Sequence, residues 1–236
     1  MSCTKILITA PLKQERHIFR EYQDALDALV IPDGVIIERF FVVNDCPEIV
    51  KDIRGSYIVM NTGDRYDKAV NSHIWTHDNL TKMHDLRNAT IQFARAGGYD
   101  YWFSVDTDLV LHPMTLQALL AADKDIVSEI FWTNGWCNAW LHDQSGGMRT
   151  EWHIPGLYQV GMTGALTLVK RKVFTAIDYT PIPNIVKALW GEDRHFCVRA
   201  ACAGFEMWVD THYPAEHLYT EQAYQAFIMR RRDGNV

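Results

Sequence analysis

The apolar positions in the first part of the chain fall into short continuous runs, separated by one stretch with helical spacing. Continuous apolar runs cover residues 5–9, 35–44 and 56–61, and apolar side chains recur every three or four positions over residues 15–29. Short runs bounded by turn residues predict strands, and the three-to-four spacing predicts an amphipathic helix. The chain is therefore expected to begin with a strand, a helix and two further strands.

The same alternation continues through the middle of the chain. A long amphipathic helix is predicted over residues 76–96 and closes at a glycine pair, and an aromatic, β-branched strand begins at residue 100. A helix over residues 114–122 and a strand over residues 125–131 complete this part. Strands that alternate with helices of this length are typical of an α/β fold with a mostly parallel central sheet flanked by helices.

The second half of the chain has a different character. Residues 131–158 hold four Trp side chains and one Tyr without a clear period, which predicts a loop-rich aromatic insert. Gly161 and Gly164 interrupt the next apolar segment, and glycine in a strand indicates that another group approaches the backbone closely. The remaining expected elements are a helical piece at 184–189, a helix at 194–203, a strand at 206–210 and a solvated, fraying C-terminal tail at 229–236.

Composition and charge exclude several classes of protein. A hydrophobic share of 48% indicates a globular chain, and the net charge of −6 provides no field that would attract nucleic acid or an anionic membrane. No apolar run approaches the ~18 residues of a membrane span, and the N-terminus lacks the apolar stretch of a secretory signal. We therefore expect a cytoplasmic location. Five cysteines without a Cys-x-x-Cys pair argue against a disulfide framework and a zinc cage.

Two carboxylates, Asp106 and Asp108, stand at the end of the aromatic strand, shortly before Pro113. Side chains two positions apart in an extended segment point the same way, so both can converge on one ion while Thr107 faces elsewhere. Carboxylate oxygens suit Mg²⁺ or Mn²⁺, which typically bridge one or two carboxylates to substrate phosphates. A bound diphosphate is the first hypothesis for this site, and a pair of solvated loop acids is the alternative.

The other predicted strands also end in polar or turn residues. In an open α/β sheet, ligands bind just beyond the carboxyl ends of the strands. The strand ends expected along this edge are residues 9–11, 44–45, 62–64 and 106–108. This agreement favours the metal and diphosphate hypothesis over the solvated acids.

Three motifs, taken in order, resemble those of glycosyltransferases with the GT-A fold, most closely the family 2 type. The first is a helix with Arg87-Asn88 that leads through a glycine turn to Asp106-Thr-Asp108. The second is Trp190-Gly-Glu192-Asp193, followed by a helix that ends at Gly204, and the third is a late strand with His217 beyond it.

A length of 236 residues favours a single domain, and the resemblance covers most of residues 5–219. The parts of this domain would be a Rossmann-like nucleotide-sugar-binding half over 5–112, an acceptor-binding and catalytic half over 113–220 and a tail over 221–236. The implied donor is a nucleotide-diphosphate sugar, with a UDP-sugar favoured over a GDP-sugar, and the implied acceptor is a carbohydrate or another hydroxyl-bearing molecule. Asn44-Asp45-Cys46 replaces the commoner Asp-Asp-Gly-Ser, which leaves the nucleotide base open.

Particular residues of this chain match the metal site of the family. The resemblance implies that Asp108 coordinates Mn²⁺ or Mg²⁺, and that Asp106 contacts the ribose, the metal or both. His217 would be a third metal contact. His212 competes with it, because a histidine near an apolar strand is often structural.

The donor site also carries over by resemblance. The residues expected around the base and ribose are Thr9, Ala10, Pro11, Thr107 and either Asn44 or Asp45. Lys82 and Arg87 stand where related enzymes can place a basic contact to the base. Both could equally be surface charges on an exposed helix face.

Glycosyl transfer needs a stabilised leaving diphosphate and an activated acceptor hydroxyl. A divalent ion meets the first need as a Lewis acid. The resemblance places Asp193 as the general base of an inverting single displacement, with Glu192 orienting the acceptor or the base. An acidic pair at a helix N-terminus is also explained by capping alone. The aromatic insert and Trp190 would offer stacking faces to a sugar or to an aromatic acceptor, or would simply pack.

Three rival functions remain at this point. A phosphatase of the haloacid dehalogenase type fits Asp106-Thr-Asp108, but that motif usually lies on the first strand and its downstream partners are lacking here. A sugar-phosphate nucleotidyltransferase would need a glycine-rich, arginine-containing loop after the first strand. A non-catalytic carbohydrate-binding domain on the same fold is the third possibility, and the Glu192-Asp193 pair argues against it.

Overall fold

The structure, a computed structural model, describes residues 3–63, 68–69, 72–73, 77–141, 150–183 and 191–234. Three predictions fall outside these residues: the helical piece at 184–189, the stacking role of Trp190 and the position of Asp64 at the end of the third strand. No described helix is long and apolar enough to cross a bilayer.

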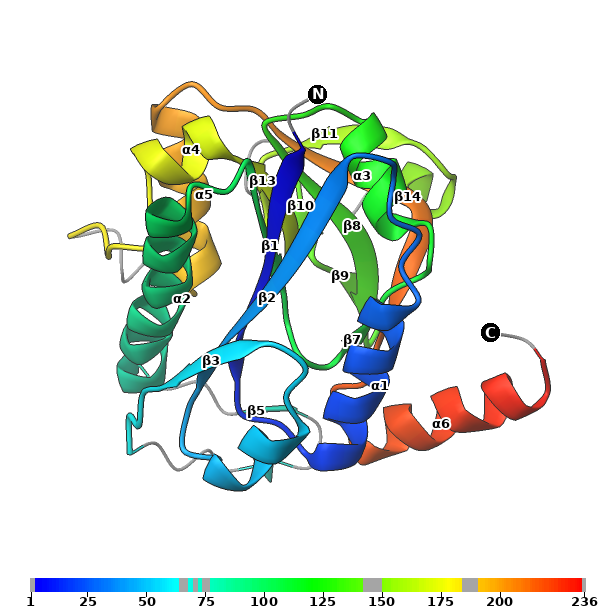
Figure 1. Ribbon diagram of the computed structural model, residues 1–236. Helices are drawn as coiled ribbons and strands as arrows, with labels where there is room; N and C mark the ends of the chain where they lie inside the picture. The colour runs from blue at the N-terminus through cyan, green and yellow to red at the C-terminus, as the bar shows by residue number, and fades with distance from the viewer. Residues whose placement is uncertain are drawn as a thin grey trace.

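One half of the central sheet is parallel. Strands β6, β1, β2 and β3 lie side by side in this order and run in one direction. Figure 1 shows the last three of them. The four strands span Tyr101–Val105, Thr4–Leu12, Val35–Val43 and Ser56–Val59. All four were expected from the apolar runs, although β1 continues three residues further than its run indicated. This half is the Rossmann-like part of the molecule.

The other half of the sheet is mixed. β13 (Leu166–Lys170) is antiparallel to both β6 and β8 (Ile126–Thr133), and β14 (Met207–His217) is parallel to β8. β11 (Leu157–Val160) closes this edge as an antiparallel neighbour of β14. The register between β8 and β14 shifts after Asp210, which bends the long strand β14 toward the carboxyl end of β6.

Helices cover both faces of the sheet. α2 (His77–Gly97), α4 (Arg171–Ala176) and α5 (Glu192–Cys202) cover one face, and α1 (Arg16–Asp27) and α3 (Thr115–Ala121) cover the other (Figure 1). Two buried apolar clusters fill the spaces between the sheet and these helices. The prediction of a mostly parallel central sheet flanked by helices is confirmed. α4 was not predicted, because its six residues are too few for a periodic pattern.

The C-terminal tail that was predicted to fray over residues 229–236 is helical as far as Arg232, although its side chains are exposed as predicted from residue 229 to residue 234. Residues 221–232 form helix α6 (Glu221–Arg232), and the Thr220 side chain caps it by accepting a hydrogen bond from the Ala223 amide at 3.1 Å. Phe227 of α6 is buried with Leu218 and with Ile18 of α1. These contacts attach the helix to the first helix of the fold.

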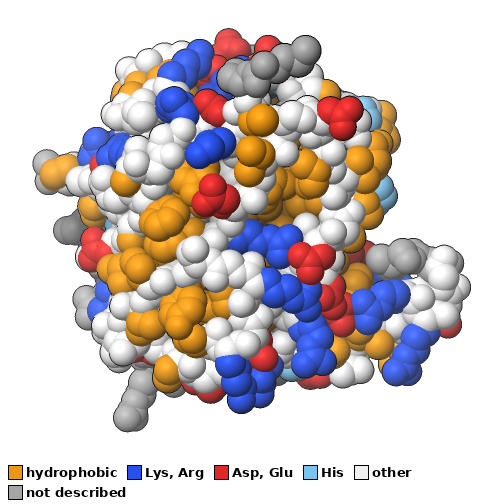
Figure 2. Space-filling model, viewed as in Figure 1, with side chains coloured by type: hydrophobic (Ala, Val, Ile, Leu, Met, Phe, Trp, Pro, Cys, Tyr) orange, Lys and Arg blue, Asp and Glu red, His pale blue; other side chains and the backbone are white. Residues whose placement is uncertain are grey.

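The shorter elements connect the main ones. They are β4 (Lys68–Ala69), β5 (Ser72–His73), β7 (Leu109–Val110), β9 (Trp136–Cys137), β10 (Ala139–Trp140), β12 (Met162–Thr163) and two 3-10 helices, η1 (Pro47–Asp52) and η2 (Thr150–His153). Strand β3 forms the outer edge of the parallel half, and hydrophobic side chains gather on the surface around it (Figure 2). Tyr57, Ile58 and Val59 of this strand are all exposed.

Candidate functional site

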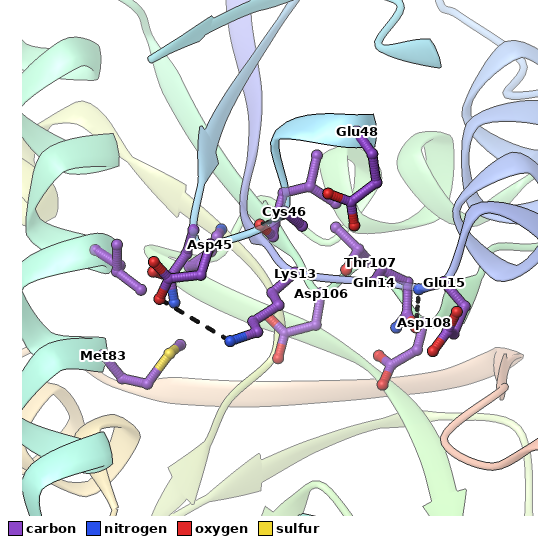
Figure 3. A pocket seen from close by; sticks show the side chains of 14 residues that line it. Lys13, Gln14, Glu15, Asp45, Cys46, Glu48, Met83, Asp106, Thr107 and Asp108 are labelled. Carbon is purple, nitrogen blue, oxygen red and sulfur yellow. Dashed lines mark hydrogen bonds and ion pairs between the residues drawn. The ribbon is translucent and has the colours of Figure 1, made fainter. Parts of the chain in front are cut away.

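A pocket of about 300 Å³ lies beyond the carboxyl ends of β1, β2 and β6 (Figure 3). Three loops and two side chains of α2 form its walls. The lining residues are Pro11, Leu12, Lys13, Gln14, Glu15, Asn44, Asp45, Cys46, Glu48, Met83, Leu86, Asp106, Thr107 and Asp108. The predicted ligand edge of the sheet is therefore a real cavity, and its sides are both apolar and charged.

The parallel pairing of β1 with β2 brings the first two loops together. Leu12 pairs with Val43 at the last position of the two strands, and the Asn44 amide donates to the Leu12 carbonyl at 2.8 Å. Two predicted donor contacts are corrected by this register. Thr9 and Ala10 are fully buried inside the sheet, so their side chains do not reach the pocket, which begins at Pro11.

Asn44 and Asp45 hold the loop that follows β2. The Asn44 side-chain oxygen accepts hydrogen bonds from the amide and the hydroxyl of Thr62, at 3.1 and 2.9 Å. Asp45 has a φ of 50°, a left-handed conformation that aspartate tolerates better than most residues. Its carboxylate accepts from the Thr62 hydroxyl at 3.1 Å and lies 4.0 Å from the Lys13 ammonium (Figure 3). Both residues line the pocket, as expected of donor-binding residues.

The two predicted metal contacts that are farthest apart in sequence lie next to each other. The Asp108 Oδ2 atom is 3.4 Å from Nε2 of His217, because β14 pairs with β7 directly after the Asp106-Thr-Asp108 motif. The Thr133 hydroxyl binds Nδ1 of His217 at 2.7 Å and orients the ring. His212 is 46% exposed in its side chain and binds Asp210 at 2.9 Å instead. The structure therefore brings His217 and not His212 to Asp108.

The donor set of Asp108 and His217 fits a divalent cation. Two ligand atoms that each lie about 2.1 Å from one ion are separated by roughly 3 to 4 Å, and the observed separation is 3.4 Å. Within the described part of the chain, no group of three His, Cys, Asp or Glu side chains is arranged around a common centre. Such an ion would therefore need oxygens from the ligand itself, as phosphates provide for Mg²⁺.

The charge of the pocket also favours a bound divalent cation. Five carboxylates line it, those of Glu15, Asp45, Glu48, Asp106 and Asp108, against the single ammonium of Lys13 among the lining residues. An anionic diphosphate would meet net repulsion in this pocket unless a cation entered with it. The pocket is therefore electrostatically suited to a metal-bound anion.

Arg87 lies at the centre of the carboxylates behind the pocket. Its side chain is 3% exposed, which excludes the interpretation of Arg87 as a surface charge on an exposed helix face. Two of its nitrogens donate to the two oxygens of Asp106, at 2.9 and 3.1 Å, and its Nε donates to Glu192 at 3.0 Å. Lys82, the other predicted basic contact, is half-buried on α2 and is not among the residues that line the pocket.

Glu192 and Asp193 form the first turn of α5, which Gly191 introduces with a φ of 109°. The Asp193 carboxylate lies against Gly164, where any side-chain Cβ would overlap it, so the predicted close approach at this glycine is confirmed. Burial raises the pKa of Asp193 to about 8, although Arg87, 3.9 Å away, acts in the opposite direction. Only the ionised form of this carboxyl can accept a proton, and a pKa of about 8 makes that form prevalent above pH 8.

The aromatic insert divides into buried and exposed members. Trp152 is 2% exposed and belongs to the core, whereas Trp136 is 63% exposed. Trp132 stacks on His153 with ring centroids 4.2 Å apart. Packing therefore explains Trp152, and a stacking role for Trp132 and Trp136 stays a prediction.

Several lining residues were not expected. Lys13, Gln14 and Glu15 follow the end of β1, and Cys46 and Glu48 follow the end of β2. The signal that could have found them is position, because loops directly after parallel strands supply ligand contacts in open α/β sheets. Met83 and Leu86 of α2 have no comparable signal, since an apolar helix face is usually core.

No family model matches this chain, and no curated protein matches it in sequence. Solved structures of glycosyltransferases nevertheless share its fold. GalNAc-T7, solved with UDP, GalNAc and Mn²⁺, has a TM-score of 0.61 at 11% identity, over 92% of this chain and 44% of its own. TarS from S. aureus has a TM-score of 0.57 at 14% identity, over 89% of this chain and 60% of its own.

A third neighbour is the mannosyltransferase PcManGT from Pyrobaculum calidifontis, solved with GDP-Man and Mn²⁺. It has a TM-score of 0.51 at 14% identity, over 97% of this chain and 61% of its own. This chain thus spans less than two thirds of the length of these three neighbours. The comparisons show that its fold is of the GT-A glycosyltransferase type, with a mostly parallel central sheet flanked by helices.

Proposed function

We propose that this protein is a metal-dependent glycosyltransferase that moves a sugar from a nucleotide-diphosphate sugar to an acceptor hydroxyl. The observation that carries the proposal is the pairing of Asp108 with His217 at 3.4 Å, beside an acidic pocket at the carboxyl ends of the parallel strands. This pairing brings a carboxylate and an imidazole from two distant segments of the chain to one place. It is supported by the GT-A fold, which alone would not define a function.

The donor binds with its nucleotide in the pocket of Figure 3. Asn44, Asp45 and Pro11 contact the base and ribose, and Asp106 and Thr107 lie beneath the ribose and diphosphate. Lys13 adds the one ammonium among the lining side chains and contacts a phosphate oxygen or the ribose. A UDP-sugar is favoured over a GDP-sugar, since GalNAc-T7 was solved with UDP and TarS with UDP-GlcNAc, although PcManGT was solved with GDP-Man.

Asp108 and His217 would hold the divalent ion, Mn²⁺ or Mg²⁺. Such an ion would supply Lewis-acid stabilisation of the leaving diphosphate. The protein contributes the orientation of both ligands: Thr133 orients the His217 ring, and the backbone amide of Leu218 donates to the Asp108 carbonyl at 2.7 Å. Fixed ligands of this kind reduce the reorganisation needed during the reaction.

Asp193 acts as the general base of an inverting single displacement. The acceptor hydroxyl oxygen forms a bond to the anomeric carbon, the bond from that carbon to the diphosphate oxygen breaks, and the hydroxyl proton passes to the Asp193 carboxylate. Glu192 orients Asp193 through their shared neighbour Arg87. The acceptor is a carbohydrate or another hydroxyl-bearing molecule, and Trp132 or Trp136 stacks on it.

The phosphatase alternative is disfavoured by the geometry of Asp106. A nucleophilic aspartate needs an oxygen directed at the substrate phosphorus, whereas both Asp106 oxygens accept hydrogen bonds from the Arg87 guanidinium. A non-catalytic carbohydrate-binding module is separated from an enzyme by experiment, because a binder leaves the donor sugar unchanged.

The first test is a thermal-shift screen of UDP, GDP and their sugar conjugates, with and without Mn²⁺. We expect one nucleotide to stabilise the protein only with the ion, by about 2.7 kcal/mol at a concentration 100 times its dissociation constant. Asp108→Asn should remove this shift, and Asp33→Asn, a change at an exposed turn, should keep it. Release of nucleoside diphosphate from the selected donor then separates an enzyme from a binding module. The proposal fails if no nucleotide shifts the wild-type protein.

A further inference from the structure

The guanidinium group of Arg87 is surrounded by protein side chains and does not face the pocket. The side chain is 3% exposed, and it donates to Asp106, Glu192 and the Ser104 hydroxyl at distances from 2.9 to 3.2 Å. Asp193 follows at 3.9 Å. The donor nitrogens of the side chain are therefore committed to protein groups, and Arg87 is not among the residues that line the pocket.

The partners of Arg87 come from different parts of the fold. Asp106 follows β6 in the parallel half, where the donor pocket lies, and Glu192 and Asp193 begin α5 on the other side of the site. Arg87 itself is on α2, between them. One guanidinium thus connects the carboxylate of the donor side with the acidic pair of the acceptor side.

The three carboxylates need a cation between them, because their charges repel one another. Three carboxylates surround one cation, and like charges in a buried region repel each other strongly when no cation separates them. Burial raises the pKa of both Asp106 and Asp193, and the charge of Arg87 lowers it in both. Arginine suits this position because its charge is permanent and its planar group binds a carboxylate through two nitrogens.

Tyr179 packs against the Arg87 side of this cluster. Its ring lies 5.8 Å from the guanidinium carbon of Arg87, and its hydroxyl donates to Asp193 at 3.4 Å. Tyr179 is itself 3% exposed and stacks on Phe196 of α5. The Arg87 side of the cluster is therefore closed by packed side chains, while the carboxylates of Asp106 and Asp193 stay partly exposed, at 32% and 23% of their side-chain surface. A packed guanidinium can hold such partners in a fixed place.

We propose that Arg87 is a positioning residue that fixes the acidic pair of α5 relative to Asp106, and that it does not contact the nucleotide. This inference rests on the proposed function and deepens it, because one side chain, Arg87, would then set the distance between the donor side and the general base. It also replaces the expectation that Arg87 contacts the base. A general base that is misplaced by about 1 Å costs roughly 100-fold in rate.

The test separates positioning from donor binding in Arg87→Gln. We expect its kcat for transfer or donor hydrolysis to fall about 100-fold, while its dissociation constant for the nucleoside diphosphate with Mn²⁺ stays within about threefold of wild type. Arg87→Lys keeps the charge but loses the two-nitrogen contact, so it should recover part of the lost rate. A dissociation constant that rises tenfold or more, with kcat retained, would overturn the proposal and make Arg87 a nucleotide contact.

A matched control lies on the same helix. Arg95 is also partly buried and binds the backbone carbonyls of Phe174 and Ile177, at 2.6 and 3.0 Å, with no contact to the acidic pair. Arg95→Gln should therefore leave kcat within about threefold of wild type at temperatures where the protein is folded. An equal loss of kcat in Arg95→Gln would mean that helix docking, and not the carboxylate link, sets the rate.

A second variant keeps the test decisive if Arg87→Gln does not fold. Glu192→Gln removes the charge of one partner and leaves the Arg87 pair with Asp106 intact. We expect a smaller fall in kcat, about tenfold, again with unchanged nucleotide affinity. An unchanged kcat in Glu192→Gln would contradict the positioning role. Failure of the proposed function would give a different result, because the wild-type protein would then bind neither UDP nor GDP with Mn²⁺.

Discussion

At the scale of single residues, the environment decides what each carboxylate can do. Asp106 and Asp108 are two positions apart, yet Asp106 binds Arg87 through both oxygens while Asp108 lies beside His217. Asp193 is different again, because burial raises its pKa to about 8 against the opposing charge of Arg87. Three chemically equal side chains therefore have three separate roles in the proposed reaction.

The raised pKa of Asp193 predicts the pH dependence of the reaction. At pH 7 the carboxyl is mostly protonated, and only the ionised form accepts a proton, so kcat should rise as the pH passes through about 8. Stability changes in the opposite sense, since the contribution of a raised folded-state pKa is lost as the pH rises through it. A pH profile of kcat from 6 to 9 at saturating donor and Mn²⁺ checks the rate.

Two outcomes would contradict this assignment. A flat profile over this range would mean that Asp193 does not titrate as the base in the complex. Asp193→Asn should lower kcat by about 10² to 10⁴-fold at every pH, so a variant with nearly full activity would exclude Asp193 as the base.

At the scale of elements, helix α6 shows how a segment with a weak sequence signal becomes ordered. Its polar residues dominate the pattern, and only Phe227 is fully buried, against Leu218 and Ile18. The ion pair of Arg231 with Glu21 of α1 and the Thr220 cap add to this contact. Since Leu218 directly follows His217, α6 also anchors the end of the strand that carries the predicted metal contact.

Phe227→Ala therefore tests the attachment of α6. We expect the substitution to lower the free energy of unfolding by about 3 kcal/mol, because a buried aromatic ring leaves a cavity. Met229 is a matched control on the same helix, since it is 62% exposed, and Met229→Ala should change stability by less than about 0.5 kcal/mol. Urea unfolding followed by fluorescence measures both, and equal effects of the two substitutions would contradict the docked helix.

At the scale of the whole molecule, one sheet connects the donor side to the acceptor side. β13 pairs with β6 of the parallel half and with β8 of the mixed half. The sheet is therefore continuous across the two predicted halves of the chain, which divide at residue 113. Buried apolar clusters on both faces include residues of each half. A chain with a continuous core of this kind is expected to unfold cooperatively.

The single-domain prediction is tested by calorimetry. We expect one unfolding transition with equal calorimetric and van't Hoff enthalpies, and a nucleotide with Mn²⁺ should shift the whole transition upward. Two transitions, of which only one responds to the nucleotide, would show that the halves are separate folding units.

Local sequence patterns predicted the strands of the parallel half, the long helix before Asp106 and the position of the acidic motif at a strand end. These features are local, because apolar runs, helical spacing and turn residues act within a few positions of one another. The sequence also placed Asn44, Asp45 and Asp108 at the pocket, since strand ends in a parallel sheet share one edge.

Which side chains meet in the site depends on how distant elements pack, and local sequence patterns did not predict it. The choice between His217 and His212 depended on the pairing of β14 with β7, and the burial of Thr9 and Ala10 depended on how far β1 extends beside β2. Arg87 looked equally suited to solvent, and its partners lie 19 and 105 positions away in sequence. Contacts over such distances follow from the packing of whole elements, because no local preference of the chain specifies them.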